Sequence, residues 1–432
     1  MLETVDWSFT TLPAFCSRAA EVYGKAPAIE DRGKVLSYRQ LDAAQRHFAR
    51  ALIARGIEPG DKVMIWAPNT WHWIVAALGI ASAGAVLIPA STRFKSAEVE
   101  DLALRGGVRL LVSCGRFLGQ DYPAMLSPAT RAGLVDVVVT EGDAGADTGW
   151  SDFLPRAASV DEAALAARIA ALTPDSTADI LFTSGTTGRS KGVMYGHGQF
   201  LRVVANWTRR VGLQRGDRTL VIPPFFHAFG YRGGAIGSLI VGATILPHQS
   251  YDPAEVLGRI QADRVSVIPG PPAIFQGMLN NPGLAAFDRT SLRLGITGGA
   301  VIPSVLVERM RSDLGFAGVC NGYGLTECGG YGAMCRHDDP VEVIANTAGK
   351  PMDGVEIAIM GEGGALLAPD QTGEVVIRGY IVMKGYFEDP VATQATIDPQ
   401  GWLHTGDIGR IRKDGNLVIE DRLKDMFIVG GF

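Results

Sequence analysis

A strand-like run followed by a glycine- and hydroxyl-rich loop is the most informative part of this chain: Ala178-Asp-Ile-Leu-Phe-Thr183-Ser-Gly-Thr-Thr-Gly-Arg-Ser-Lys191-Gly192. The apolar residues at its start predict a buried strand. The residues that follow combine glycines, hydroxyl side chains and the cation of Lys191. Polyphosphates are bound by such freed backbone N–H groups, hydroxyl donors and cations. The segment therefore predicts a strand that ends in a phosphate-binding loop, in preference to a flexible glycine turn.

This loop differs from the P-loop of kinases and GTPases. That motif needs Gly-Lys-Ser/Thr, whereas here Ser190 precedes Lys191 and Gly192 follows it.

Strands and helices alternate on both sides of the loop. Residues 36–56 form an amphipathic helical pattern with Leu41, Phe48 and Leu52 on one stripe, and residues 71–90 predict a buried helix and then a buried strand. Further strand-like runs lie at 61–68, 108–114, 218–226, 265–272 and 292–299. Such alternation predicts parallel α/β sheets. The polar stretch 141–176 is expected to be a surface connection.

The pattern changes after about Asn346. Short β segments separated by turn residues occupy 355–360, 374–379 and 401–422, and Lys413-Asp-Gly-Asn416 between apolar runs predicts a hairpin. The last eighty or so residues therefore predict a small antiparallel β subdomain. We expect α/β subdomains at 1–175 and 176–345, a β-barrel subdomain at 346–423 and a hinge region at 424–432.

Composition narrows the class of protein. The chain has 432 residues, of which 47% are hydrophobic and 20% charged, so general disorder is excluded. A net charge of −5 gives no basic footprint for nucleic acid. Five cysteines, none spaced C-x-x-C, favour a reduced, cytoplasmic protein, and we expect no membrane span in the apolar run 74–90. The spacing of Cys320, Cys328, Cys335 and His337 fits no zinc pattern.

Five segments together resemble the acyl-adenylate-forming (ANL) superfamily: acyl- and aryl-CoA synthetases, peptide-synthetase adenylation domains and luciferases. Besides the loop at 183–192, Ser82–Ser91 (SAGAVLIPAS) resembles an early structural segment of the family. Asn321–Glu327 (NGYGLTE) resembles its Y-G-x-T-E motif, Gly401–Asp407 (GWLHTGD) its W-x-x-T-G-D motif and Asp421–Asp425 (DRLKD) its hinge motif. The resemblance covers about Leu36 to Phe432.

The resemblance implies two stacked α/β subdomains in αβαβα layers, with mostly parallel sheets, plus the small antiparallel barrel. It implies activation of a carboxylic acid by ATP and Mg²⁺ to acyl-AMP, and then thioester formation with coenzyme A. Three alternatives stay open: a ligase that performs only the thioester half-reaction, an adenylation domain that loads a carrier protein, and an inactive nucleotide-binding homologue. The oligomeric state is also open, with a homodimer among the alternatives.

The resemblance also assigns residues. Catalytic roles fall on Thr183, Lys191, His227, Thr326 and Glu327, with Glu327 as the Mg²⁺ ligand, a role that suits a hard oxygen donor. Nucleotide-binding residues are Thr183, Ser184, Gly185, Thr186, Thr187, Gly188, Lys191, Gly298, Gly299, Ala300, Asn321, Gly322, Tyr323, Gly324, Thr326, Asp407 and Arg422. Three of the polar residues have a structural role as the alternative: Glu327 as a helix cap, Asp407 as a turn residue and Arg422 as a surface residue.

The acyl pocket is expected to involve His227, Phe229, Gly233, Gly234, Pro269, Gly298 and Gly324. A lone histidine on an apolar strand is usually structural, but the family carries an aromatic residue or histidine here, so we expect His227 to shape the pocket and not to act as a general base. Glycines at 230–234 predict room for a bulky acyl group. Residues 265–276 with 185–192 look most like actinobacterial CoA ligases for fatty, steroid-derived or terpenoid acids.

The chain ends inside the hinge motif, where Lys424 matches the family's hinge position. Family members continue with a mobile domain of about a hundred residues, a normal size for a lid domain, that carries a catalytic lysine. A chain without that domain is expected to bind nucleotide and acyl-adenylate but to turn over poorly.

Overall fold

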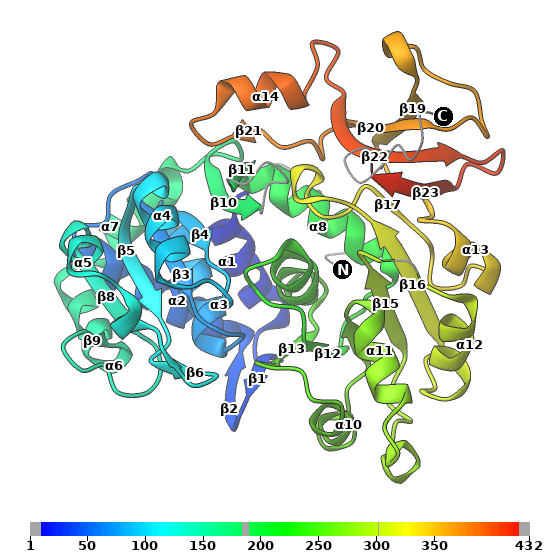
Figure 1. Ribbon diagram of the computed structural model, residues 1–432. Coiled ribbons are helices and arrows are strands. Elements are labelled where there is room, and N and C mark those ends of the chain that lie inside the picture. The colour runs from blue at the N-terminus through cyan, green and yellow to red at the C-terminus, as the bar shows by residue number, and fades with distance from the viewer. Residues whose placement is uncertain (1–9, 184–189, 301, 423–432) are drawn as a thin grey trace. The chain divides into compact units, whose positions relative to one another are not determined.

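The computed structural model describes residues 10–183, 190–300 and 302–422. They form two compact units (Figure 1). The first contains residues up to 204 together with 214–216 and 220–250, and the second contains 205–213, 217–219 and residues from 251 on.

The first unit is built on a largely parallel sheet with the order β11-β10-β4-β3-β5-β8-β9. Only β10 and β11 pair in antiparallel fashion. All four residues of β4 and four of the five in β3 are buried, as expected for strands covered on both faces. The bounds are β3 Lys62–Trp66, β4 Val86–Pro89, β5 Val108–Ser113, β8 Asp136–Val139, β9 Thr148–Gly149, β10 Thr177–Thr183 and β11 Lys191–Gly196.

Smaller strands complete the unit. β1 (Pro27–Asp31) pairs with β13 (Thr244–Pro247) in parallel and with β2 (Lys34–Ser37) in antiparallel fashion, while β6 (Arg116–Phe117) and β7 (Gln120–Asp121) form a separate hairpin.

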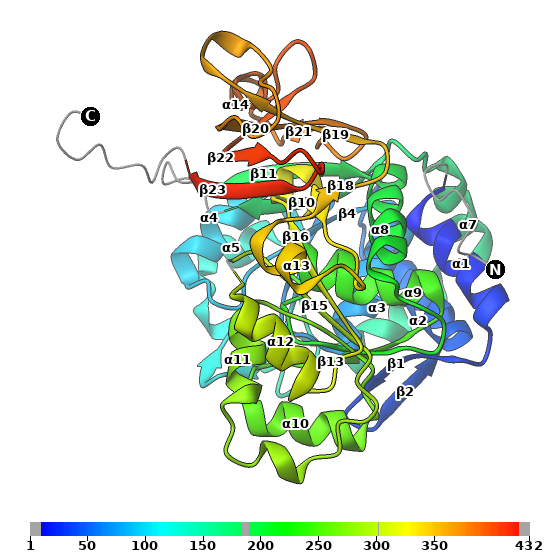
Figure 2. The ribbon, with the colours of Figure 1, turned by 90° about the vertical axis from the view of Figure 1, so that its right-hand side faces the viewer.

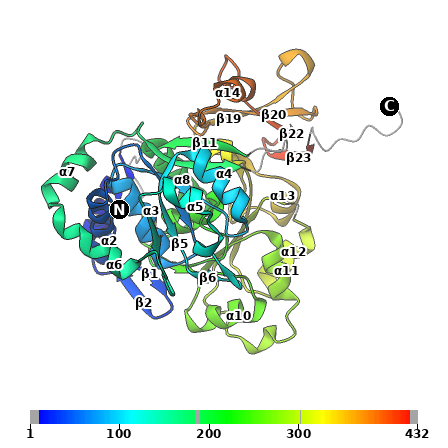
Figure 3. The same cartoon turned by 60° about the vertical axis from the view of Figure 1, so that its left-hand side comes forward.

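The helices of the first unit start at clear sequence signals. Ser37 and Gln40 form a capping box at the start of α2, and Thr70 caps α3. Helices α2 and α3 pack closely, since a Cβ on Gly79 would come within 2.8 Å of the Gln45 carbonyl oxygen. Figure 3 shows α4 and α5 beside β5. The bounds are α1 Leu12–Tyr23, α2 Tyr38–Ala54, α3 Trp71–Ser82, α4 Ser96–Gly106, α5 Pro128–Gly133, α6 Trp150–Phe153, α7 Glu162–Ala171 and α9 Gly237–Val241.

Two expectations for this unit have clear outcomes. The buried helix and strand predicted at 71–90 are α3 and β4, and no helix among the described residues is long and apolar enough to cross a membrane. The prediction that 141–176 is a plain connection was wrong, because this stretch contains α6 and α7. Asp161 caps α7, and Leu165 is its one buried residue, so the helix has no apolar stripe to reveal it.

The second unit has its own parallel strands, β14, β15 and β16, in that order. Thr219 of β12 pairs with β14, and β17 and β18 extend the other edge in antiparallel fashion. The strand bounds are β12 Arg218–Val221, β14 Val267–Pro269, β15 Leu294–Gly298, β16 Gly318–Tyr323, β17 Ala333–Met334 and β18 Lys350–Pro351. The helices are α10 Pro253–Ala262, α11 Pro272–Leu279, α12 Ser304–Ser312, α13 Val341–Asn346 and α14 Pro390–Thr396, and α8 (His197–Val211) includes the division between the units.

The end of the described chain forms an antiparallel sheet of order β19-β20-β22-β23, drawn side by side in Figure 2. Its strands are β19 Val355–Met360, β20 Gly373–Gly379, β22 Leu403–Ile411 and β23 Leu417–Arg422, and β21 is Gly385–Tyr386. Ile411 pairs with Leu417 across the predicted Lys413–Asn416 turn, so the hairpin is confirmed. The fold class predicted from the sequence, α/β with a small antiparallel subdomain, is also confirmed.

Candidate active site

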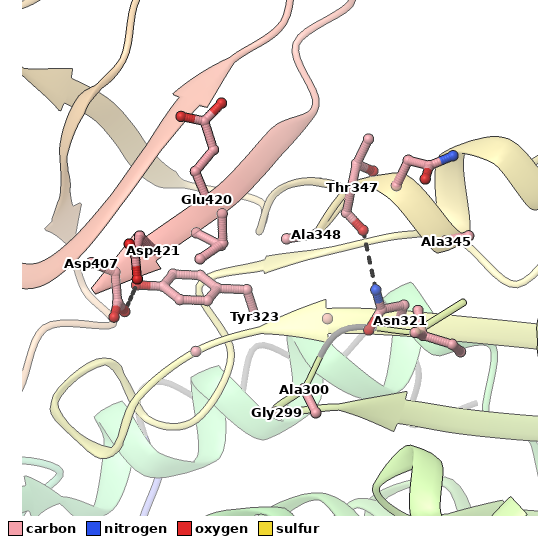
Figure 4. A pocket seen from close by; sticks show the side chains of 15 residues that line it. Gly299, Ala300, Asn321, Tyr323, Ala345, Thr347, Ala348, Asp407, Glu420 and Asp421 are labelled. Carbon is pink, nitrogen blue, oxygen red and sulfur yellow. Dashed lines mark hydrogen bonds between the residues drawn. The ribbon is translucent and has the colours of Figure 1, made fainter. Parts of the chain in front are cut away.

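A cavity of about 510 Å³ opens in the second unit (Figure 4), a size in the range of small-molecule sites. The segment after β15, strand β16, the end of α13 with the loop that follows it, and the β22–β23 pair contribute its walls. It is lined by Gly299, Ala300, Ile302, Asn321, Gly322, Tyr323, Gly324, Ala345, Asn346, Thr347, Ala348, Asp407, Ile419, Glu420 and Asp421. The cavity thus unites residues of three predicted nucleotide segments, at 299–300, 321–324 and 407, while Gly298 is not among the lining residues.

Glycines shape the wall made by β15 and β16. Gly298 pairs with Gly322 in parallel register, and a Cβ on Gly298 would lie 2.6 Å from the Gly322 carbonyl oxygen. Gly324 is equally tight, since its Cβ would come within 2.3 Å of the Gly330 carbonyl oxygen. Gly299 has a φ of +76°, which favours glycine. Gly298 and Gly324 therefore let neighbouring backbone segments pack closely, whereas no atom of the other described residues, its chain neighbours aside, lies within 4 Å of a Cβ on Gly299.

The side chain of Asn321 has a structural task. Its amide nitrogen donates to the carbonyl oxygens of Ile344 and Thr347 at 3.0 and 3.1 Å, which fixes the loop after α13 against β16 (Figure 4). The predicted nucleotide role of Asn321 thus includes building the opposite wall of the cavity, at Thr347 and Ala348.

Tyr323 and Asp407 meet at one side of the cavity. The Tyr323 hydroxyl donates to Asp407 Oδ2 at 2.5 Å (Figure 4), and the side chain of Asp407 is buried. Burial and the Asp407 charge raise the pKa of Tyr323 well above its usual value, so the phenol stays protonated and donates. Asp407 Oδ2 therefore accepts from a neutral donor, and the carboxylate has further lone-pair positions that can accept hydrogen bonds.

The turn before Asp407 is held by its own contacts. The Gly406 N–H donates to Glu374 Oε1 at 3.0 Å, and His404 Nδ1 lies 2.8 Å from Glu374 Oε2. Thr405 donates to the Val375 carbonyl oxygen at 2.6 Å. Asp407 pairs with Arg422 in the β22–β23 register. The Arg422 side chain lies outside the described part of the chain, as does the predicted hinge residue Lys424.

Thr326 and Glu327 lie on the short helix Thr326–Cys328 that follows β16. The Glu327 carboxylate accepts a hydrogen bond from the Tyr386 hydroxyl at 2.9 Å. Within the described ranges no group of three or more His, Cys, Asp and Glu side chains could hold a metal ion. Mg²⁺ that arrives with a nucleotide needs only one or two carboxylates beside the phosphates and waters, so the oxygen donors of Glu327 fit such an ion.

The two ends of the phosphate loop are placed by strand pairing in the first unit. Thr183 ends β10 opposite Lys191, the first residue of β11, and the Thr183 hydroxyl donates to the Lys191 carbonyl oxygen at 3.5 Å. Arg105 of α4 donates to the Ser190 carbonyl oxygen and hydroxyl at 2.9 and 2.8 Å. The remaining predicted loop residues, Ser184, Gly185, Thr186, Thr187 and Gly188, lie outside the described residues.

The predicted acyl-pocket residues divide between the units. His227, Phe229, Gly233 and Gly234 belong to the first, and Pro269, Gly298 and Gly324 to the second. His227 has an exposed side chain, and desolvation and the positive charge of Arg93 lower its pKa from the usual value. The pocket as a whole stays a prediction.

Residues Phe229–Ile236 form a π-helix, a rare element often found at functional sites. The expectation that its glycines leave open volume was wrong for Gly234, since a Cβ there would come within 2.5 Å of Val221 Cγ1. Gly230 likewise faces the Pro223 and Pro224 carbonyl oxygens at 2.3 Å. These two glycines serve close packing.

Sequence reasoning missed several residues that support the site. Arg105, Glu374 and Tyr386 contact the predicted residues directly or through the adjoining backbone. Each comes from an element remote in sequence from its partner. A local motif cannot reveal such a pair, because its signal lies in the tertiary fold.

Known proteins share both the sequence and the fold. The chain matches the family described as AMP-binding enzyme over residues 16–387. A Mycobacterium tuberculosis protein, 3-[(3aS,4S,7aS)-7a-methyl-1,5-dioxo-octahydro-1H-inden-4-yl]propanoyl:CoA ligase, is 44% identical over 422 residues, which cover 98% of this chain and 81% of the relative. The chain therefore belongs to the AMP-binding enzyme family.

Two solved structures agree with this assignment. The inhibitor-bound N-terminal domain of FACL13 from Mycobacterium tuberculosis has a TM-score of 0.85 at 28% identity and covers 96% of this chain and 100% of that one. O-succinylbenzoate coenzyme A synthetase from Bacillus subtilis, in complex with ATP and magnesium ion, has a TM-score of 0.81 at 25% identity and covers 97% of this chain and 81% of that one. Within the family the chain is an acyl-CoA ligase, which is an acid–thiol ligase.

Proposed function

We propose that this ligase activates a bulky, hydrophobic carboxylic acid with a short carboxyl-bearing chain on a fused ring system, of the steroid-derived kind. The observation that carries this proposal is the 44% identity, over 98% of the chain, to a ligase whose acyl group is a propanoyl chain on a methylated, fused bicyclic dione. A second relative of the same name, from Rhodococcus jostii, is 42% identical.

We assign the nucleotide to the cavity in the second unit. The backbone at Gly299 and Gly322 lines the cavity and suits the flat adenine ring, and Asp407 is the acceptor for the ribose hydroxyls. Charge-assisted hydrogen bonds of this type are about twice as strong as neutral ones. The tyrosine that lines the cavity, Tyr323, keeps Asp407 in place.

The proposed reaction has two steps, and the charges of the reactants determine what the site must supply. The acid carboxylate attacks the α-phosphorus of ATP, pyrophosphate leaves and acyl-AMP forms; the coenzyme A thiol then attacks the acyl carbon and displaces AMP. Two anions meet in the first step, so cations and hydroxyl donors at the phosphates lower its barrier. We assign this role to Lys191 and Thr183 of the phosphate loop and to Thr326. Mg²⁺, when bound at Glu327, supplies further neutralisation of phosphate charge.

His227 shapes the acyl end of the site in this proposal. An imidazole N–H can donate one hydrogen bond to the acid carboxylate. Phe229 and Pro269 supply apolar surface for the ring system.

Binding of non-hydrolysable acyl-adenylates tests the proposal. We would measure the melting temperature of the 432-residue chain with acyl-sulfamoyl adenosines that carry the fused-ring propanoyl, a long-chain fatty acyl or a feruloyl group. A ligand at a thousandfold excess over its Kd stabilises by about 4 kcal/mol, so the preferred acyl group should give the largest shift. The fused-ring analogue is expected to give that shift.

A larger shift with the fatty or feruloyl analogue would contradict the proposed acid while leaving the ligase class intact. Asp407→Asn provides the matched control. It should reduce the shifts of all three analogues by a similar amount, because they share the adenosine.

A further inference from the structure

The segment 380–386 contacts Glu327 at two points. The Met383 N–H donates to the Glu327 carbonyl oxygen at 2.9 Å, and the Tyr386 hydroxyl donates to Glu327 Oε1, also at 2.9 Å. Both the backbone and the carboxylate of Glu327 are therefore fixed from the same side. Tyr386 is buried, so its ring has little freedom to leave this position.

Tyr386 is itself anchored by the start of α14. Its N–H donates to the Thr393 hydroxyl at 2.9 Å, and this hydroxyl donates to the Asp389 carbonyl oxygen at 2.8 Å. Gly385 has a φ of +140°, and a Cβ there would approach Thr393 Cγ2 to 3.0 Å. Asp389 caps the helix through the Ala392 N–H at 2.9 Å. These contacts together fix the position of the Tyr386 ring, whose hydroxyl contacts the Glu327 carboxylate.

The hydrogen bond from Tyr386 occupies one acceptor position of the Glu327 carboxylate. A carboxylate has about four lone-pair positions on its two oxygens. A donor on Oε1 therefore orients the carboxylate plane while leaving it able to bind a cation.

We propose that Tyr386 is a positioning residue for divalent metal binding, because its hydroxyl holds the Glu327 carboxylate in the orientation that receives the nucleotide-bound metal ion. This inference rests on the metal role of Glu327 in the proposed function. Ligating carboxylates are commonly hydrogen-bonded by residues behind them, and loss of such a partner costs about 10–100-fold in metal affinity or activity.

The test is a titration of Mn²⁺ followed by electron paramagnetic resonance, on the full chain with a saturating non-hydrolysable ATP analogue. Tyr386→Phe removes only the hydroxyl and should raise the Kd for Mn²⁺ about tenfold. Binding of an acyl-sulfamoyl adenosine, which needs no metal, should be unchanged. The second readout separates loss of metal positioning from damage to the whole site.

Tyr380→Phe is the matched control. The Tyr380 hydroxyl lies in the same segment and accepts from Asn206 Nδ2 at 2.6 Å. This variant should bind Mn²⁺ as the wild type does. Equal Mn²⁺ affinity in Tyr386→Phe and Tyr380→Phe would overturn the inference.

Glu327→Gln distinguishes this failure from failure of the proposed function. If Glu327 holds the metal, this variant loses more Mn²⁺ affinity than Tyr386→Phe. Unchanged Mn²⁺ affinity in Glu327→Gln would overturn the metal role of Glu327, and the inference about Tyr386 with it. Weaker adenosine-analogue binding in Tyr386→Phe, by the same factor as for Mn²⁺, would show a general structural role instead.

Discussion

Two buried aspartates, one in each unit, have opposite surroundings. In the second unit Asp407 accepts from a neutral phenol and lines a cavity of about 510 Å³. In the first unit Asp179 of β10 pairs with Arg232 of the π-helix at 2.8 Å, and the side chains of both are at most 1% exposed. One carboxylate faces space that a ligand can fill, and the other is sealed against a cation.

The sealed pair is not fully satisfied. Arg232 Nε and Nη1 and Asp179 Oδ2 have no hydrogen-bond partner among the described residues. The guanidinium lies 4.1 Å from the centre of the Tyr195 ring and 5.0 Å from that of Phe200, which compensates part of its lost hydration. Burial raises the pKa of Asp179 even beside Arg232. The comparison teaches that buried charge marks a binding site only where a cavity adjoins it.

The largest effect is expected from breaking the sealed pair. Arg232→Met leaves the Asp179 carboxylate buried without its cation, so the free energy of unfolding should fall by about 3–5 kcal/mol in urea denaturation. Nucleotide affinity of the folded fraction should stay near that of the wild type. The double variant Asp179→Leu, Arg232→Met should recover part of the loss. A decrease of less than about 1 kcal/mol in the free energy of unfolding of the single variant would show that the ion pair does not stabilise the fold.

A second buried ionisable group in the first unit predicts a pH effect. His197 is fully buried, its Nδ1 accepts from the Leu12 N–H at 3.4 Å, and desolvation lowers its pKa from 6.5 to about 4. The unfolded chain therefore binds a proton in a pH range where the folded chain does not. The stabilising contribution is complete above pH 6.5 and is lost as the pH falls towards 4, by up to about 3 kcal/mol.

Urea denaturation between pH 7 and pH 4 checks this expectation. His197→Gln should show a smaller loss of stability than the wild type over the window. Parallel curves for the two proteins would assign the acid sensitivity to other groups.

On the cavity side, Asp407→Asn should act on binding and not on the fold. The variant keeps the shape of the side chain but loses the charge that accepts ribose hydroxyls, so nucleotide affinity should fall about 10–100-fold, the equivalent of 1.5–3 kcal/mol. Isothermal titration calorimetry with AMP gives the affinity. The urea midpoint should barely move. Loss of stability with unchanged affinity would place Asp407 with Asp179, as a structural carboxylate.

The smallest effect is expected for Tyr323→Phe. The change removes one hydrogen bond to Asp407 and leaves the ring at the cavity wall, so AMP affinity should fall by about 2–10-fold, as for a bond worth 0.5–1.5 kcal/mol. The same titration measures it. An effect larger than that of Asp407→Asn would mean that the hydroxyl contacts the nucleotide itself.

Some features around these two aspartates could be predicted from the sequence, and others could not. Asp407 could be predicted because its neighbours in Gly401–Asp407 form a local motif, and β14 and β15 because apolar runs end at turn residues. The pairing of Asp179 with Arg232 could not, since 53 residues separate them and neither lies in a recognisable pattern. Side-chain pairs of this kind are fixed by packing, which a local pattern does not encode.

The same reason accounts for the other differences. Helix α7 buries only Leu165, so no 3.6-residue stripe marks it. The π-helix 229–236 has no sequence period of its own. The sequence also does not show that Val221 packs against Gly234 and fills the space beside it. Tyr386 gains its importance only from the position of Glu327. Motifs predicted several residues that line the cavity, such as Asn321 and Asp407, while the residues that hold them in place required the fold.

A crystal structure of the chain with a fused-ring acyl-sulfamoyl adenosine is the most direct test of the proposed nucleotide site. We expect adenine against the backbone at Gly299 and Gly322, near Thr347, with the ribose hydroxyls on Asp407 and the Tyr323–Asp407 hydrogen bond retained. Adenosine bound elsewhere, with the cavity between β15, β16 and β22 empty, would contradict it.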